Sequence, residues 1–161
     1  MAGKKSEEKT NVMRLLEQKK IPYKSYDYSS TGAIGGEEVA RVLGQDPNRV
    51  FKTLVTIAKS GTNYVFVVPV NRELDLKKAA SIVGEKKIEM LKSKELLPLT
   101  GYVHGGCSPI GMKKPFVTVV HETGLEYESI IFSGGKIGSQ VEMNPKELEK
   151  FVKVSFGDIT E

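Results

Sequence analysis

Near the N-terminus, apolar residues recur at the spacing of a helix. Val12, Leu15 and Leu16 form one apolar stripe. Ser6 is a suitable N-cap for this helix, and Pro22 marks its end. Helical spacing or capping signals also mark residues 37–43, 75–83, 93–97 and 144–152. The pattern therefore predicts several short helices rather than one long one.

Strand-like alternation of apolar and polar residues is clearest at residues 51–59 and 64–70. The turn between these segments is so short that the two strands must pair antiparallel. Further strands are predicted at residues 22–28, 113–121, 129–132 and 141–143. Helices and antiparallel strands mix without regular βαβ units. We therefore predict an α+β fold, in which a curved sheet carries helices on its flanks.

Composition narrows the class of protein. The 161 residues are 39% hydrophobic and 27% charged, without repeats or linkers, which predicts a single domain over residues 1–161. The net charge of +4 permits an anionic partner without requiring one. A lone cysteine rules out a disulfide scaffold and a four-cysteine zinc site, and we predict neither a metal nor a cofactor. No apolar run is long enough for a membrane helix and no signal peptide is evident, so we expect a cytoplasmic protein without membrane contact.

Lys52 is the first candidate for chemistry, because it stands at the start of an apolar strand. Alternation places Lys52 on one face with Leu54 and Ala58, while Phe51 lies on the other. An ammonium group in this position could hold a phosphate or a substrate carbonyl oxygen in a cleft. Judged from the residues alone, an ordinary edge lysine that extends into water is the alternative.

A glycine-rich loop at residues 101–111 is the second candidate, since five of its eleven residues are glycine or proline. Such a loop lets backbone N–H groups approach a ligand, as in an oxyanion hole, although an ordinary long turn is the alternative. Cys107 follows His104 by three residues and is a possible nucleophile. No signature of a cysteine hydrolase surrounds it, which favours a structural role.

Two further features are open to two interpretations each. The turn that begins with Ser133-Gly134-Gly135-Lys136 is either a phosphate contact or a loose hairpin. Residues 77–94 hold six lysines against two glutamates, which is either a solvated helix face or a docking surface for an RNA backbone.

Taken together, three motifs resemble the YbaK/EbsC family, whose members are relatives of the editing domain inserted in bacterial prolyl-tRNA synthetases. The similarity is greatest to the branch of Cys-tRNA(Pro) deacylases, and it extends from the first helix to residue 159. The resemblance implies a barrel-like, largely antiparallel sheet. The motifs are Phe51-Lys52-Thr53-Leu54, Gly105-Gly106-x-Ser108-Pro109-x-Gly111 and Ser133-Gly134-Gly135-Lys136-x-Gly138.

The resemblance also implies a set of site residues. Lys52 and the backbone N–H groups of Gly105, Gly106 and Cys107 would form the catalytic centre, with the N–H groups as oxyanion donors. Ile137 departs from the family, which often has a basic residue there, and this weakens a phosphate role for that turn. The expected substrate-binding residues are Tyr26, Phe51, Thr53, Gly101, Ser108, Pro109, Ser133, Gly134 and Gly135.

The activity implied by the resemblance is trans-editing, the hydrolysis of cysteinyl-tRNA(Pro) with help from the thiol of the substrate. The implied partners are mischarged tRNA(Pro) and prolyl-tRNA synthetase. Proline and cysteine are similar in size, and such a difference in a pocket is worth only about 1–3 kcal/mol, so a second enzyme is needed to remove the error. The alternatives are a deacylase for another mischarged tRNA, such as alanyl-tRNA(Pro), and a non-catalytic module that binds tRNA or the synthetase.

Overall fold

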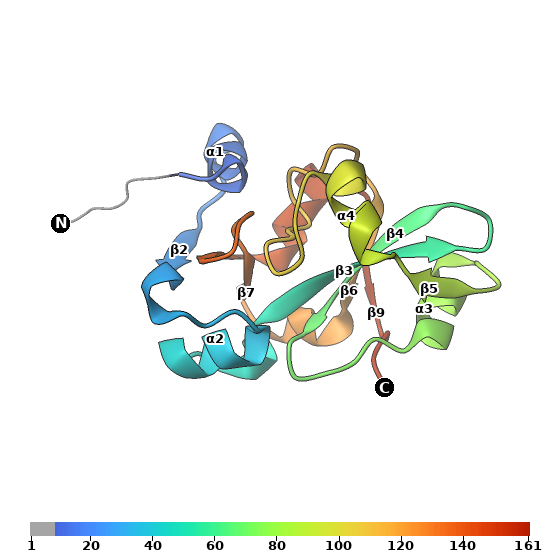
Figure 1. Ribbon diagram of the computed structural model, residues 1–161, viewed down its shortest axis with the longest axis horizontal. Helices are drawn as coiled ribbons and strands as arrows, with labels where there is room; N and C mark the ends of the chain where they lie inside the picture. The colour runs from blue at the N-terminus through green and yellow to red at the C-terminus, as the bar shows by residue number, and fades with distance from the viewer. Residues whose placement is uncertain (1–8) are drawn as a thin grey trace.

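The computed structural model describes residues 9–161, which form two β-sheets with short helices around them (Figure 1). The larger sheet has the strand order β5-β3-β4-β6-β9, and the smaller sheet has the order β2-β8-β7. The strands are β2 (Lys24–Asp27), β3 (Phe51–Ala58), β4 (Asn63–Pro69), β5 (Ile88–Met90), β6 (Val117–His121), β7 (Ile130–Ser133), β8 (Ser139–Met143) and β9 (Val154–Gly157).

Most of the helices are one to two turns long. The α-helices are α1 (Asn11–Gln18), α2 (Gly36–Leu43), α3 (Leu76–Val83) and α4 (Ser93–Thr100). The 3-10 helices are η1 (Ser29–Thr31), η2 (Pro47–Arg49), η3 (Glu122–Glu126) and η4 (Pro145–Lys150). In this described part of the chain, no helix has the length and apolar character needed to cross a membrane.

The strand pairing confirms the α+β class and the predicted hairpin, because β3 pairs antiparallel with β4. Four of the six strand pairings within residues 9–161 are antiparallel, as expected, but the sheet is not closed into the expected barrel. It is divided into two open sheets, and β6 pairs in parallel with both β4 and β9. The chain between β4 and β6 contains α3 and α4, and such a long crossover can bring a strand back in parallel.

Helix ends also differ in part from the prediction. The first helix begins at Asn11 and is capped by Thr10, whose hydroxyl accepts from the backbone N–H of Met13 at 3.2 Å. The predicted cap Ser6 lies outside the described residues. The segment after Asn144 was expected as an α-helix but forms the 3-10 helix η4, with Asn144 accepting from the N–H of Lys146 at 2.9 Å.

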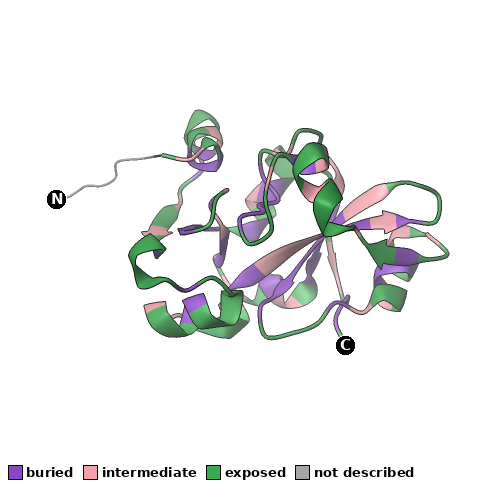
Figure 2. Ribbon diagram, viewed as in Figure 1, coloured by how far each residue is buried: buried purple, intermediate pink, exposed green. Residues whose placement is uncertain are grey.

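β3 lies between two clusters of the core, and Figure 2 shows that this strand is buried or half-buried along its length. Phe51 and Val55 pack into the main cluster on one side. Leu54 and Ala58 pack on the other side, in a cluster that includes the apolar face of α3. The predicted division of this strand into two faces is therefore confirmed. Because both faces are packed, the start of β3 gives a rigid mounting for Lys52.

Candidate active site

A cavity of about 390 Å³ opens beside the start of β3. This volume is within the range of small-molecule sites. Its walls come from β3, the first turns of α2 and α4, and the loop around residue 105. The residues that line it include Tyr28, Phe51, Lys52, Thr53, Ser93, Leu96, His104, Gly105, Cys107, Ser133 and Gln140.

Lys52 lines this cavity and has one long polar contact. Its Nζ lies 3.5 Å from Oε2 of Glu73, a carboxylate that is 76% exposed. The Lys52 side chain is 30% exposed, so its charge is neither buried nor fully hydrated. An exposed ion pair of this length is weak. The ammonium group is therefore available to an anionic or carbonyl oxygen of a ligand.

The two glycine-rich turns of the sequence pack against each other. A Cβ atom at Gly106 would lie 3.0 Å from Cα of Lys136 and from the backbone nitrogen of Ile137. Gly105 has a φ of +90°, a conformation that favours glycine, and lies against Ile137. Both glycines are therefore required by the shape of this wall of the cavity.

The backbone N–H groups of this turn are not equivalent. The N–H of Gly106 donates to the carbonyl oxygen of Val103 at 2.9 Å, so it is already used within the protein. The N–H groups of Gly105 and Cys107 have no acceptor among residues 9–161. Of the three expected oxyanion donors, these two remain free for a ligand.

Cys107 lines the cavity but is a poor nucleophile. The residue is 8% exposed, and burial raises the pKa of its thiol to about 12. The thiol therefore stays protonated at neutral pH, and the thiolate is the reactive form. The structural role favoured by the sequence agrees with this environment.

The remaining predicted residues fall into two groups. Phe51, Thr53 and Ser133 line the cavity. The hydroxyl of Thr53 is buried and has no hydrogen-bond partner among the described residues, whereas the hydroxyl of Ser133 accepts from the N–H of Gly135 at 3.1 Å. The residues that lie outside the cavity lining are Tyr26, Gly101, Gly106, Ser108, Pro109, Gly134 and Gly135.

Most of this second group holds the shape of the two turns. Gly101 ends α4 with a φ of +88°. The hydroxyl of Ser108 accepts from the N–H of Ile110 at 3.3 Å. A Cβ atom at Gly134 would collide with the side chain of Ser139. These residues act on the cavity through the backbone that they shape.

Tyr26 takes part in a separate polar cluster, which we call the anchor cluster and which consists of Tyr26, Arg49, Ser129 and Glu142. The hydroxyl of Tyr26 donates to Glu142 at 2.5 Å, and Arg49 donates to the same carboxylate at 2.6 Å. The hydroxyl of Ser129 also donates to Glu142. Burial raises the pKa of Glu142, but these hydrogen bonds and the charge of Arg49 outweigh it and lower the pKa overall.

Tyr28 is a cavity residue that the sequence analysis did not single out. It is 4% exposed and lines the cavity directly after the end of β2. Gln140 also lines the cavity and shares hydrogen bonds with Gln45. The sequence signal for Tyr28 was its position two residues after Tyr26, where strand alternation gives two tyrosines the same side.

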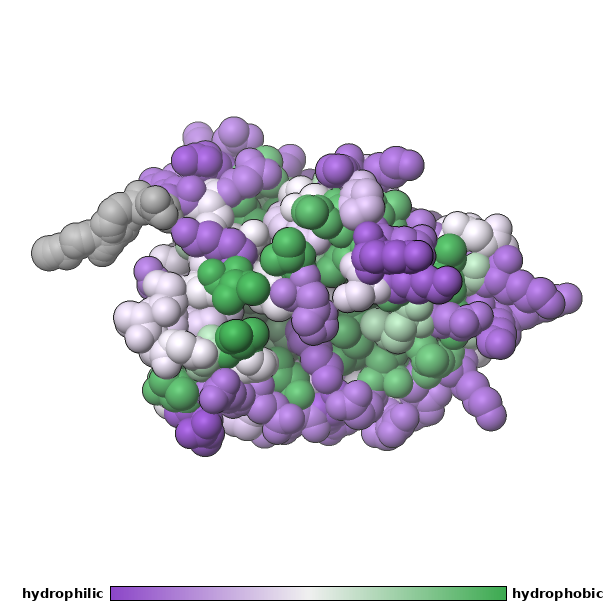
Figure 3. Space-filling view, viewed as in Figure 1, coloured by the Kyte–Doolittle hydropathy of each residue, from purple (hydrophilic) through white to green (hydrophobic). Residues whose placement is uncertain are grey.

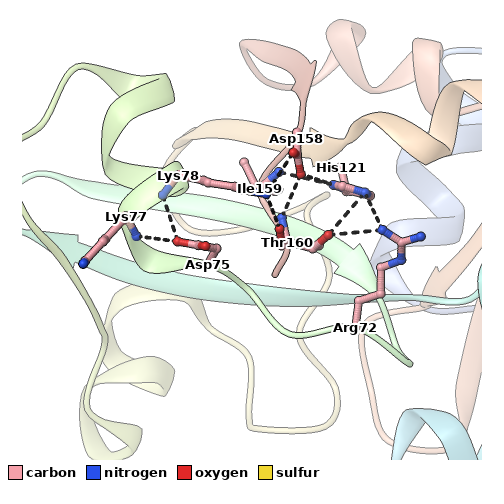
Figure 4. Close-up of polar contacts among 8 residues, drawn as sticks. All are labelled: Arg72, Asp75, Lys77, Lys78, His121, Asp158, Ile159 and Thr160. Carbon is pink, nitrogen blue, oxygen red and sulfur yellow. Dashed lines mark hydrogen bonds and ion pairs between the residues drawn. The ribbon is translucent and has the colours of Figure 1, made fainter.

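A further polar cluster surrounds His121 at the C-terminal end of the chain, away from the cavity lining (Figure 4). His121 is buried, and its Nε2 lies 3.3 Å from Nη1 of Arg72 and 3.4 Å from the hydroxyl of Thr160. Burial lowers the pKa of His121. This cluster ties the last residues to the segment before α3, where the N–H of Glu161 donates to the carbonyl oxygen of Glu73.

Comparison with known proteins gives relatives over nearly the whole chain. The family model described as an aminoacyl-tRNA editing domain matches residues 33–151. A protein of Enterococcus faecalis named Cys-tRNA(Pro)/Cys-tRNA(Cys) deacylase EbsC is 48% identical over 161 residues, which are 99% of this chain and 98% of that protein. Proline–tRNA ligase of Thermosipho melanesiensis is 33% identical over 100 residues, which cover 62% of this chain and 17% of the ligase.

Two solved structures are also similar to this chain over most of its length. A structure described as a trans-editing enzyme for prolyl-tRNA synthetase matches with a TM-score of 0.79 and 27% identity, covering 93% of this chain and 94% of that one. The hypothetical protein APE2540 matches with a TM-score of 0.85 at 22% identity, over 94% of this chain and all of that one. The second match bears on the fold alone.

Proposed function

Since the chain belongs to the aminoacyl-tRNA editing domain family, we propose that it removes cysteine from mischarged tRNA(Pro) and that the cavity beside Lys52 is its active site. The family match and the full-length relative confirm the resemblance seen in the sequence and the predicted enzyme class, an aminoacyl-tRNA deacylase. The site residues and the whole chain's role as a single editing domain are part of this proposal.

One observation carries the site assignment. Lys52, Gly105 and Cys107 line one cavity, although more than fifty residues separate Lys52 from the other two in sequence, and the N–H groups of Gly105 and Cys107 have no acceptor among residues 9–161. A cation and two backbone donors around a common space suit an ester whose carbonyl oxygen gains negative charge during cleavage. In the proposed complex, the N–H groups bind that oxygen and Lys52 holds the ribose–phosphate end of the terminal adenosine.

A buried polar group of the wall has a role in the same complex. The hydroxyl of Thr53 has no partner within residues 9–161, and an unsatisfied buried polar group costs about 1–3 kcal/mol. A hydrogen bond to the substrate would recover this cost. We assign this hydroxyl to substrate binding, while Phe51 and Tyr28 supply the wall beside it.

The proposed reaction uses the substrate as its own nucleophile, consistent with the protonated thiol of Cys107. The sulfur of the esterified cysteine attacks the ester carbonyl carbon. The new carbon–sulfur bond replaces the bond to the ribose oxygen, which leaves with the thiol proton as the free 3′ end of the tRNA. Water then opens the four-membered thiolactone to cysteine. The enzyme contributes positioning and stabilisation of the oxyanion.

Prolyl-tRNA synthetase is the proposed protein partner. The support is the similarity to part of a proline–tRNA ligase and to a structure described as a trans-editing enzyme for that synthetase. A complex with the synthetase would supply the choice of tRNA(Pro), and the cytoplasm, where tRNA is charged, is the location that goes with it.

The test is a deacylation assay with tRNA(Pro) charged separately with cysteine and with alanine. We expect rapid release of cysteine and slow release of alanine. Equal rates would favour a broader deacylase. Binding of tRNA without release of either amino acid would make the chain a non-catalytic binding module.

A further inference from the structure

Exposed lysines border the α4 end of the cavity. Lys92 and Lys94 flank Ser93, which itself lines the cavity at the start of α4. At the other end of this helix, Nζ of Lys113 donates to the carbonyl oxygen of Pro98 at 3.2 Å. We define the α4 surface as Lys86, Lys87, Lys92, Lys94, Lys113 and Lys114, all of which are exposed.

The charge of the α4 surface is largely unbalanced. Residues 86–95 contribute two acidic side chains, Glu89 and Glu95. Among the described residues, one ion pair joins this set, between Lys87 and Glu89 at 4.0 Å, and both partners are 68% exposed. Figure 3 shows hydrophilic side chains over the region of α4 and β5. A phosphate backbone would therefore meet a positive surface directly beside the cavity.

The structure separates these lysines from Lys77 and Lys78, their neighbours in the sequence. Lys78 is bound by Asp158 at 2.9 Å and by the carbonyl oxygen of Thr160 at 2.8 Å (Figure 4). Its helix, α3, packs into the core on the side of β3 opposite to the side where Leu96 of α4 packs. The lysine-rich segment is therefore divided between two helices, of which α4 contributes residues to the cavity lining and α3 contributes none.

We propose that the α4 surface binds phosphates of the tRNA acceptor stem and so directs the charged 3′ end into the cavity. This proposal rests on the proposed function. With eight residues, α4 is about 12 Å long, enough to lie along several phosphates of one strand. Residues 86–95 contain no aromatic side chain on which a base could stack, so this contact reads the backbone and not the sequence.

A charge-reversal experiment tests the proposal. The Lys92→Glu/Lys94→Glu variant is compared with Arg14→Glu/Lys20→Glu, which makes the same change in charge on and just after α1, a helix that contributes no residue to the cavity lining. Two substrates are used: cysteinyl-tRNA(Pro), and cysteine esterified to a CCA trinucleotide that lacks the stem. KM and kcat are measured at several salt concentrations.

We expect the Lys92→Glu/Lys94→Glu variant to raise KM for the whole tRNA by at least about tenfold, with kcat retained. The salt dependence of binding should fall by about one unit of slope per lysine. KM for the trinucleotide ester should not change, and the α1 variant should behave as wild type with both substrates. The same increase is expected with cysteinyl-tRNA(Cys), because phosphates carry no sequence information.

Three results would overturn the proposal: an equal rise in KM for the trinucleotide, an equal rise in the α1 variant, or loss of binding to prolyl-tRNA synthetase with an unchanged KM for tRNA. The last result would make the surface a protein-docking site. If wild-type protein cleaves neither ester, the proposed function fails. Binding of uncharged tRNA by the two variants then decides the role of the surface separately.

Discussion

Arg49, the last residue of η2, and Lys52, the second residue of β3, are three residues apart, and their charges have different surroundings. Arg49 donates to Glu142 at 2.6 Å and to the hydroxyl of Ser129 at 2.9 Å, and its guanidinium lies 5.8 Å from the ring centre of Tyr127. Within residues 9–161, Lys52 has a single polar contact, of 3.5 Å to an exposed carboxylate. The charge of Arg49 is used to hold the two sheets together, while the charge of Lys52 is left for a ligand.

The largest loss of activity is expected from a substitution at Lys52, whose charge has only a weak, exposed ion pair. Lys52→Ala should lower kcat/KM for cysteinyl-tRNA(Pro) by about a hundredfold or more, because the ester loses a positioning cation. The melting temperature should stay close to that of wild type, since the ion pair with Glu73 is exposed. Deacylation kinetics and thermal melts measure the two effects. Normal kinetics in a folded variant would contradict the site assignment.

A substitution in the anchor cluster should lower stability and leave activity nearly unchanged, the opposite of what is expected for Lys52→Ala. Glu142→Ala leaves Arg49 without its buried partner and should lower the free energy of unfolding by about 3 kcal/mol. Activity per folded molecule should remain near that of wild type, because neither residue lines the cavity. Urea titration followed by an assay under folded conditions checks both statements. A stable but inactive variant would place this cluster in the active site.

The pH dependence of the free energy of unfolding tests whether the anchor cluster stabilises the carboxylate of Glu142. The pKa of Glu142 is lower in the folded state than its ordinary value, so the unfolded chain takes up the proton first. The stability that Glu142 contributes is present above the ordinary carboxyl pKa and is lost as pH falls through the folded-state pKa. Denaturant curves at pH 6 and pH 3 should therefore show a smaller loss of stability for Glu142→Gln than for wild type. An equal loss would show that the carboxylate is not stabilised as the hydrogen bonds indicate.

Cys107 should give the smallest effect. Its thiol is neutral at neutral pH and packs in the core, so Cys107→Ala should cost about 1 kcal/mol of stability and leave deacylation unchanged. Alkylation of native protein should be slow because the thiol is buried. A loss of several hundredfold in rate with the fold intact would assign the thiol a chemical role.

Local patterns in the sequence predicted much of the fold. The hairpin of β3 and β4 followed from alternation and a short turn, and α3 followed from Asp75, whose side chain caps it at 2.9 Å and 3.0 Å. β5 and β9 were missed because three or four residues carry too little periodicity. The parallel pairing of β6 depends on distant segments that no local pattern specifies.

Local patterns in the sequence also predicted the candidate site only in part. Glycine density identified both turns that meet at Gly106, but it could not show that the N–H of this residue donates to the carbonyl oxygen of Val103 within its own turn. Tyr26 and Tyr28 look equivalent in the sequence. A carboxylate from β8 binds the first, while the second lies just beyond the end of β2 and lines the cavity, and the local pattern does not specify where that strand ends.

The central claim is that the cavity holds the ester while the thiol of the substrate cleaves it. Single-turnover deacylation of tRNA(Pro) charged with cysteine or with serine tests this claim directly, because the two amino acids differ by one sulfur-for-oxygen exchange. The account predicts fast release of cysteine and release of serine near the uncatalysed rate. Serine released as fast as cysteine would contradict it.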